Sequence, residues 1–135
     1  MYSGLVRVTL NVLGLQFTTK AAGGETADAY TINEVLLSAD PPPHKHRTEE
    51  EAIYVLEGEV DLLVGDNTVK GTAGSFVLVP RGTVHNVVST GSEAARVLII
   101  FSPAGVQGLF EEVDGQADMD KVMAAMGRYG MDLAG

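Results

Sequence analysis

The stretch HKHRTEEEAIYVLEG, from His44 to Gly58, decides both the fold and the candidate site of this chain. His44 and His46 are two residues apart, so their imidazoles point to the same face of an extended chain. Glu51 follows at the start of an apolar, strand-like run that ends in a glycine turn. Imidazole and carboxylate groups are common donors to divalent metal ions. The stretch therefore predicts three ligands of a metal site.

A second stretch supplies the fourth candidate ligand. Residues 74–88, GSFVLVPRGTVHNVV, contain His85, the last of the chain's three histidines. Three neutral imidazoles and one carboxylate leave a coordination position open, as a catalytic metal site requires. Taken singly, each histidine can be a surface or core residue, and Glu51 can be one more charge beside Glu49 and Glu50. Together, these residue types at this spacing favour a metal site.

The two stretches resemble the two sequence motifs of the cupins. Four residues match the first motif in type and spacing: His44, His46, Glu51 and Gly58. Four more match the second motif: Gly74, Pro80, Gly82 and His85. Two motif positions that are not ligands carry serine, Ser38 in place of glycine and Ser89 in place of asparagine. The resemblance implies one divalent ion per chain (Fe, Mn, Ni, Co, Cu or Zn), held by His44, His46, Glu51 and His85.

Short strands separated by turn residues are expected along most of the chain. The expected strands are 6–12, continuing toward 19, then 30–37, 51–57, 59–64, 68–70, 76–79, 85–89 and 96–101. Such regular punctuation indicates an all-β sandwich or barrel. The cupin resemblance selects a jelly-roll barrel, also called a double-stranded β-helix, with its core at about residues 30–105 of a single domain, 1–135. Residues 21–28 are small and polar and predict a loop.

The last segment changes to helical spacing. Asp118 is typical of an N-cap, and three methionines and Val122 recur on one helical face as far as Gly130, a stop signal. We expect a short C-terminal helix over about 118–129. It is predicted to pack on the barrel or on a neighbouring subunit, with a mobile lid as the alternative.

Three of the expected strands are apolar on both faces: AIYVL (52–56), FVLV (76–79) and VLIIF (97–101). Continuous apolar runs indicate a sheet that is covered on both sides. A second copy of the chain, in a two-fold homodimer, or the C-terminal helix is expected to cover the outer face. Tyr54 and Leu56 would lie in that contact.

The residues on the Glu51 face of the same strand point the other way. Ile53 and Val55 share this face with Glu51 and are expected, with Val87, to line the substrate pocket. A pocket lined in this way would have few polar groups besides the metal ligands.

The amino-acid composition limits the kinds of partner and the compartment that we expect for this protein. The chain has no cysteine, which excludes disulfides and thiolate metal sites and is compatible with the cytoplasm, where we expect the protein. A net charge of −9 argues against nucleic acid and anionic membranes as partners. No apolar run is long enough to span a membrane. The N-terminal residues 1–17 carry a single positive charge, Arg7, and are interpreted as a strand rather than a targeting segment.

The resemblance is strongest to small single-domain cupins that are similar to quercetin dioxygenases, and it includes the region FSPAGVQGLFEEV after the barrel. It implies a metal-dependent enzyme that acts on a small aromatic, flavonoid-like or polyketide-like molecule, with dioxygenase-type ring cleavage as the leading reaction and Glu51 as general base. Two alternatives stay open. One is a zinc-dependent polyketide cyclase or isomerase, and the other is a non-catalytic cupin that binds a small molecule.

Overall fold

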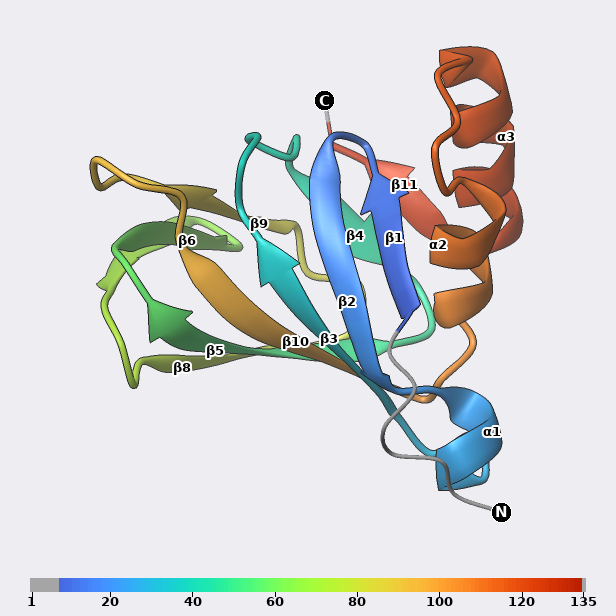
Figure 1. Ribbon diagram of the computed structural model, residues 1–135, viewed down its shortest axis with the longest axis horizontal. Helices are drawn as coiled ribbons and strands as arrows, with labels where there is room; N and C mark the ends of the chain where they lie inside the picture. The colour runs from blue at the N-terminus through green and yellow to red at the C-terminus, as the bar shows by residue number, and fades with distance from the viewer. Residues whose placement is uncertain (1–7, 135) are drawn as a thin grey trace.

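The computed structural model describes residues 8–134 and consists of two antiparallel sheets that face each other (Figure 1). One sheet has six strands, in the order β1 (Val8–Val12), β2 (Leu15–Ala21), β3 (Thr31–Leu36), β10 (Arg96–Ser102), β5 (Glu50–Glu57) and β8 (Phe76–Val79). The other has five strands, in the order β11 (Met131–Leu133), β4 (His44–His46), β9 (His85–Ser89), β6 (Val60–Val64) and β7 (Asn67–Gly71). The predicted all-β jelly-roll fold is confirmed.

Most strand boundaries agree with the prediction to within one or two residues. β8 and β9 begin and end where the sequence places them. The strand expected from residue 6 is seen from Val8 onward, since residues 6 and 7 lie outside the described residues. It forms a hairpin with β2 through Leu13 and Gly14, both at positive φ. The hairpin adds two strands to the edge of the sheet beside β3.

The segment predicted as a loop, 21–28, contains a short helix instead, α1 (Gly23–Thr26). The Glu25 carboxylate accepts a hydrogen bond from the Ala22 N–H at 3.1 Å, which closes the first turn. The Asp28 N–H donates to the Gly23 carbonyl at 2.9 Å and ends it. A single turn fixed by these two contacts leaves no helical period for sequence analysis to detect.

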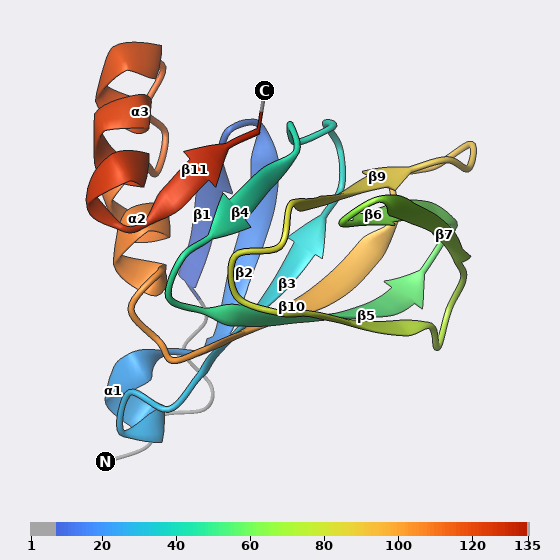
Figure 2. The ribbon, with the colours of Figure 1, turned by 180° about the vertical axis from the view of Figure 1, so that it is seen from behind.

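Two further helices, α2 (Gln107–Glu112) and α3 (Met119–Arg128), lie together beside β1 and β11 at one end of the barrel (Figures 1 and 2). The predicted C-terminal helix is α3, and its N-cap is Asp118, whose carboxylate accepts from the Asp120 N–H at 3.0 Å. The helix buries Val122 and Met126 and exposes about half of Met123. No helix in residues 8–134 has the length and apolar character that crossing a membrane requires.

After α3 the chain turns at Gly130, where φ is +76°, and returns to the barrel as β11. β11 pairs antiparallel with β4, placing Met131 opposite His46 and Leu133 opposite His44 (Figure 2). The C-terminal segment is thus hydrogen-bonded to the strand that carries two candidate ligands.

A closed ring of three hydrogen bonds attaches α2 to the six-stranded sheet. The Thr19 hydroxyl donates to Asn33 Oδ1 at 2.9 Å, Asn33 Nδ2 donates to Gln107 Oε1 at 2.9 Å, and Gln107 Nε2 donates to Thr19 Oγ1 at 3.0 Å. Asn33 and Gln107 are buried, and buried polar groups that satisfy one another specify a single arrangement. The ring fixes the first residue of α2 against β2 and β3.

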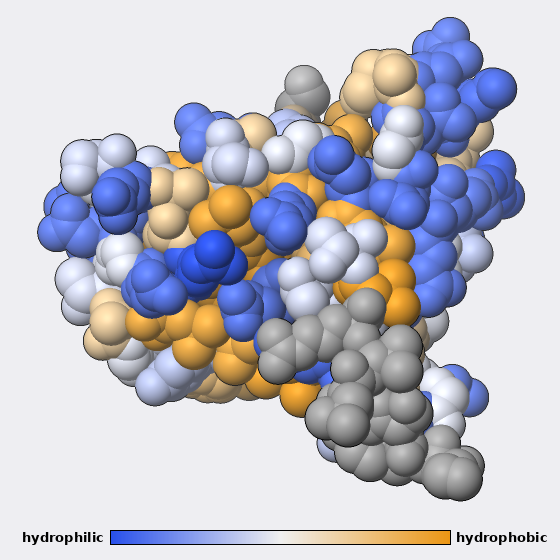
Figure 3. All heavy atoms as spheres, viewed as in Figure 1, coloured by the Kyte–Doolittle hydropathy of each residue, from blue (hydrophilic) through white to orange (hydrophobic). Residues whose placement is uncertain are grey.

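Within residues 8–134, no helix covers the outer face of the six-stranded sheet. Tyr54, Phe76 and Leu78 on β5 and β8 are 39%, 58% and 52% exposed. Figure 3 shows hydrophobic side chains gathered on the lower side of the molecule, where Figure 1 places β8, β5 and β10. The expectation that the C-terminal helix covers this face is wrong, because α3 packs at the end of the barrel beside β11 and α2.

Candidate metal centre

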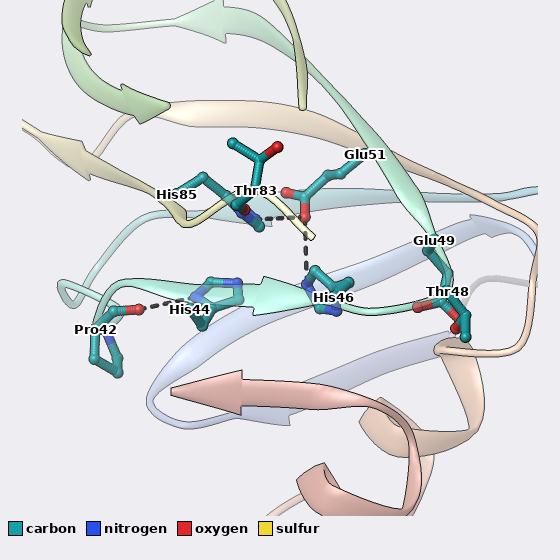
Figure 4. Close-up of polar contacts among 8 residues, drawn as sticks. All are labelled: Pro42, His44, His46, Thr48, Glu49, Glu51, Thr83 and His85. Atoms are coloured by element: carbon teal, nitrogen blue, oxygen red, sulfur yellow. Dashed lines mark hydrogen bonds and ion pairs between the residues drawn. The ribbon is translucent and has the colours of Figure 1, made fainter. Parts of the chain in front are cut away.

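The four predicted ligands come from both sheets and meet inside the barrel (Figure 4). His44 and His46 project from β4, and His85 begins β9, where it lies directly opposite His44 in the ladder. Glu51 reaches the same point from β5 in the other sheet. The short run of extended chain at residues 44–46 puts both of its imidazoles on the inner face, as the spacing predicts.

The donor atoms of these four side chains all lie within 4.8 Å of one another. Glu51 Oε1 is 2.9 Å from His85 Nε2 and 3.4 Å from His46 Nε2. His46, Glu51 and His85 are buried, and His44 is the most accessible of the four. A buried carboxylate enclosed by imidazoles is the geometry that sequence analysis anticipates for a metal site.

Backbone carbonyls orient two of the imidazoles. Nδ1 of His44 lies 2.8 Å from the Pro42 carbonyl, and Nδ1 of His85 lies 2.9 Å from the Thr83 carbonyl. Because a carbonyl only accepts, each Nδ1 carries the hydrogen, and each Nε2 is turned toward the cluster. Hydrogen bonds of this kind are what fix the tautomer of metal-binding histidines.

His46 provides the test of whether a metal fits. Both of its ring nitrogens are buried and have no hydrogen-bond partner among the described residues. The 3.4 Å contact of Nε2 with Glu51 Oε1 does not have hydrogen-bond geometry. The ring is held by an edge-to-face contact with Phe101, with ring centroids 5.0 Å apart. Buried nitrogens without partners are unfavourable, and a cation among the four donors would satisfy one of them. The donor set therefore fits a divalent ion.

The pKa values of two donors, Glu51 and His44, are shifted toward the form that binds a metal, whereas that of His85 is shifted toward the protonated form. Burial alone would raise the pKa of Glu51, but the His46 and His85 imidazoles outweigh burial and hold this pKa well below its usual range. Burial, followed by the charge of His85, lowers the pKa of His44 to about 4. Burial lowers the pKa of His85, but the Glu51 carboxylate, which accepts a hydrogen bond from this imidazole, outweighs burial, so the pKa is raised. At neutral pH Glu51 is ionised and His44 is neutral, as metal binding requires.

The four donor residues line a cavity of about 70 Å³. Strand residues of the barrel, including Phe17, Val35 and Phe101, make one wall. The C-terminal segment contributes six apolar residues to the lining, here called the C-terminal wall: Leu109, Phe110, Val113, Val122, Met126 and Met131. Among the described residues that line the cavity, Asn86 is the remaining polar one.

Of the three predicted pocket residues, Val87 lines the cavity. Ile53 and Val55 share the inward face of β5 with Glu51, but they are buried in the core and do not line the cavity. Alternation along a strand identifies the inward face but not the depth at which two sheets close upon each other. The α2 part of the C-terminal wall has no signal in the sequence, whereas the apolar face of α3 is visible in its helical spacing.

Comparison with known proteins agrees with this geometry. Residues 34–101 match the Cupin domain family. An uncharacterized protein of Streptomyces coelicolor is 37% identical over 59 residues, which cover 44% of this chain and 55% of that protein. The chain spans about half, or less, of the length of the curated relatives it matches.

Two solved structures illustrate the shared fold. An RmlC-like cupin from Shewanella frigidimarina has a TM-score of 0.65 at 22% identity, with 77% of this chain and 90% of that chain covered. The polyketide cyclase RemF from Streptomyces resistomycificus has a TM-score of 0.61 at 23% identity, with 76% and 78% covered. At these identities the likeness concerns the fold alone. Together with the match over half of its length and the four clustered donors, this fold makes the chain a member of the cupin family.

Proposed function

We propose that this cupin is a metal-dependent enzyme that acts on a small aromatic, flavonoid-like or polyketide-like molecule, with dioxygenase-type ring cleavage as its reaction. The observation that carries the proposal is that the four donors line a cavity whose other lining residues, Asn86 excepted, are apolar. An apolar cavity with a few convergent polar groups is typical of a site for a small organic ligand.

A divalent ion bound by His44, His46, Glu51 and His85 would act as a Lewis acid toward a phenolate or enolate oxygen and, if redox-active, would support oxygen chemistry. The chain's own contribution is to orient the ligand. The phenylalanine rings beside the cluster favour a flat, apolar body, and the scarcity of hydrogen-bonding side chains disfavours a sugar. Burial of the cluster excludes water from the reacting atoms.

Glu51 is the proposed general base. Its carboxylate is ionised because the two neighbouring imidazoles stabilise the charge. Burial acts in the opposite direction, so a carboxylate that loses those imidazole contacts in this surrounding has a raised proton affinity. Glu51 would then accept a proton from a hydroxyl group of the ligand and hold it at a carboxylate oxygen.

The metal content of protein purified without a metal-binding tag tests the proposal. Near-stoichiometric iron, manganese, nickel, copper or cobalt in the wild type, absent from His85→Ala, is expected, followed by oxygen consumption with flavonols or smaller enediols. A finding of stoichiometric zinc would favour a cyclase or isomerase reaction over ring cleavage. Equal metal in the wild type and His85→Ala would overturn the site.

Replacement of Glu51 by Gln distinguishes an enzyme from a binding protein. An enzyme in which Glu51 is the base loses turnover while it keeps its affinity for the ligand. Glu50→Gln is the matched control, because Glu50 is the adjacent acid and points to the other face of β5. A wild type that binds ligands but turns none over would make this cupin a non-catalytic binding module.

We also propose that a second copy of the chain covers the outer face of the six-stranded sheet. The apolar side chains Tyr54, Phe76 and Leu78 are exposed there, and charges of both signs lie on the same face at Lys20, Glu34 and Arg96. Two copies related by a two-fold axis can pair opposite charges around an apolar centre. Leu56, expected in the same contact, is half-buried in the single chain.

A further inference from the structure

The cavity beside the metal cluster is small for the ligands that the proposed function admits. Its volume is about 70 Å³, roughly half of the ~150 Å³ that holds one benzene molecule in an engineered protein cavity. Sites for drug-sized molecules are larger still, at about 300–1,000 Å³. A flavonol therefore exceeds the space, and a single ring fits only with one edge in the mouth of the cavity.

The wall that limits this space is the C-terminal segment. It lines the cavity together with the other barrel strands, through Leu109 and Phe110 from α2, Val122 and Met126 from α3, and Met131 from β11. Phe110 also packs against two phenylalanines of the barrel, with ring centroids 4.8 Å from Phe17 and 5.6 Å from Phe101. The wall and the barrel are in direct contact around the cavity.

This wall is attached to the barrel at several separate points. The buried hydrogen-bond ring of Gln107 holds its beginning, and the β11–β4 ladder holds its end. Between them, Asp114 Oδ1 accepts from the Asn11 N–H at 2.7 Å, and Arg47 Nη2 donates to the Gly127 carbonyl at 3.0 Å. Tyr129 packs so closely on Gly108 that a Cβ there would lie 2.8 Å from the ring. These contacts describe a fixed wall rather than a mobile lid.

We infer that the C-terminal wall is a specificity device that limits the ligand to a compact oxygenated molecule of at most one ring. This inference rests on the proposed function and narrows its substrate class. Met126 is the principal determinant, because it is 4% exposed, lines the cavity and sits on α3 two turns beyond the N-cap. Met123 on the same helix is 51% exposed and does not line the cavity.

Binding of three hydroxylated probes of increasing size tests the inference by calorimetric titration: catechol, 2,3-dihydroxynaphthalene and 3-hydroxyflavone. The wild type is expected to bind catechol and to bind 3-hydroxyflavone at least about tenfold more weakly. Met126→Ala opens the wall and is expected to shift this preference by about tenfold toward the larger probes. Met123→Ala is the matched control and leaves the preference unchanged.

The titrations are done on metal-free and on zinc-loaded protein, so that a size limit is seen even if no metal supports turnover. If the metal content does not depend on His85 but the size preference is present, the proposed function is wrong and the inference that the C-terminal wall limits ligand size still stands. Wild type that binds 3-hydroxyflavone as tightly as catechol, or that fails to bind catechol in both forms, would overturn the wall. So would identical preferences of Met126→Ala and Met123→Ala. If Met126→Ala does not fold, Met131→Ala carries the same expectation.

Discussion

The two walls of the cavity differ in origin and in chemistry. The barrel wall carries all four candidate metal ligands and comes from strands whose motif residues stand at fixed spacing. The C-terminal wall carries no ligand, is apolar throughout, and comes from α2, α3 and β11. In our proposals the difference separates two tasks, since the barrel wall would supply reactivity and the C-terminal wall would supply shape. Substitutions in each wall should therefore affect different measurements.

The largest effect is expected in the barrel wall. His46→Ala removes one of four donors. Because four-ligand structural zinc sites bind with about 10–16 kcal/mol, one ligand is worth roughly a hundredfold to a thousandfold in affinity. Competition with a fluorescent zinc chelator measures the loss. Met126→Ala, in the opposite wall, should bind zinc with wild-type affinity, and a comparable loss there would contradict the division of tasks.

In the C-terminal wall, Leu109→Ala is expected to reduce the free energy of unfolding by about 2–5 kcal/mol, because it leaves a void beneath α2. Leu109 is 2% exposed. Leu133→Ala, at a 42% exposed leucine of β11, is the control and should cost less than about 1 kcal/mol. Denaturant unfolding of the metal-free proteins measures both. Equal losses would mean that the wall is not packed as described.

The pH dependence of metal affinity is a second test of the difference between the walls, because the titrating candidate ligands all lie in the barrel wall. The pKa of His85 is raised above its ordinary value of 6.5, so below that raised pKa a proton must leave before His85 can bind a metal. Affinity should then fall by about tenfold per pH unit as the pH decreases through this region, and should level off above it. His44, with a pKa of about 4, adds nothing near neutrality. Zinc titrations between about pH 5.5 and 8.5 test this, and a flat profile would contradict it.

The smallest effect is expected on the outer face, away from both walls. Phe76→Ser should weaken the proposed homodimer by about tenfold or more, because a large exposed aromatic side chain at an interface centre carries much of the binding energy. Sedimentation over a range of concentrations measures the change. Val69→Ser, at a 48% exposed position on β7 of the other sheet, is the control. A wild type that is monomeric at all concentrations would rule out the second copy.

More of the barrel wall than of the C-terminal wall could be predicted from the sequence. Residue type and spacing predicted which four side chains cluster and the strands that carry them, because a motif and a two-residue period are local properties. They also placed α3, whose cap and apolar face extend over several turns. They missed α2 and β11, which have six and three residues and are too short to show a period. Which strand residues reach the cavity, as Ile53 and Val55 illustrate, depends on contacts between sheets that no local pattern encodes.

The pairing of β4 with β11 has a consequence for the order in which the protein is assembled during translation. β4 carries His44 and His46, yet it shares only one residue pair with β9 and three with β11. All four candidate ligands leave the ribosome before residues 131–133 do. The strand with two histidines therefore gains most of its ladder late, and a nascent chain that already contains every ligand still lacks the neighbour that holds half of them in place.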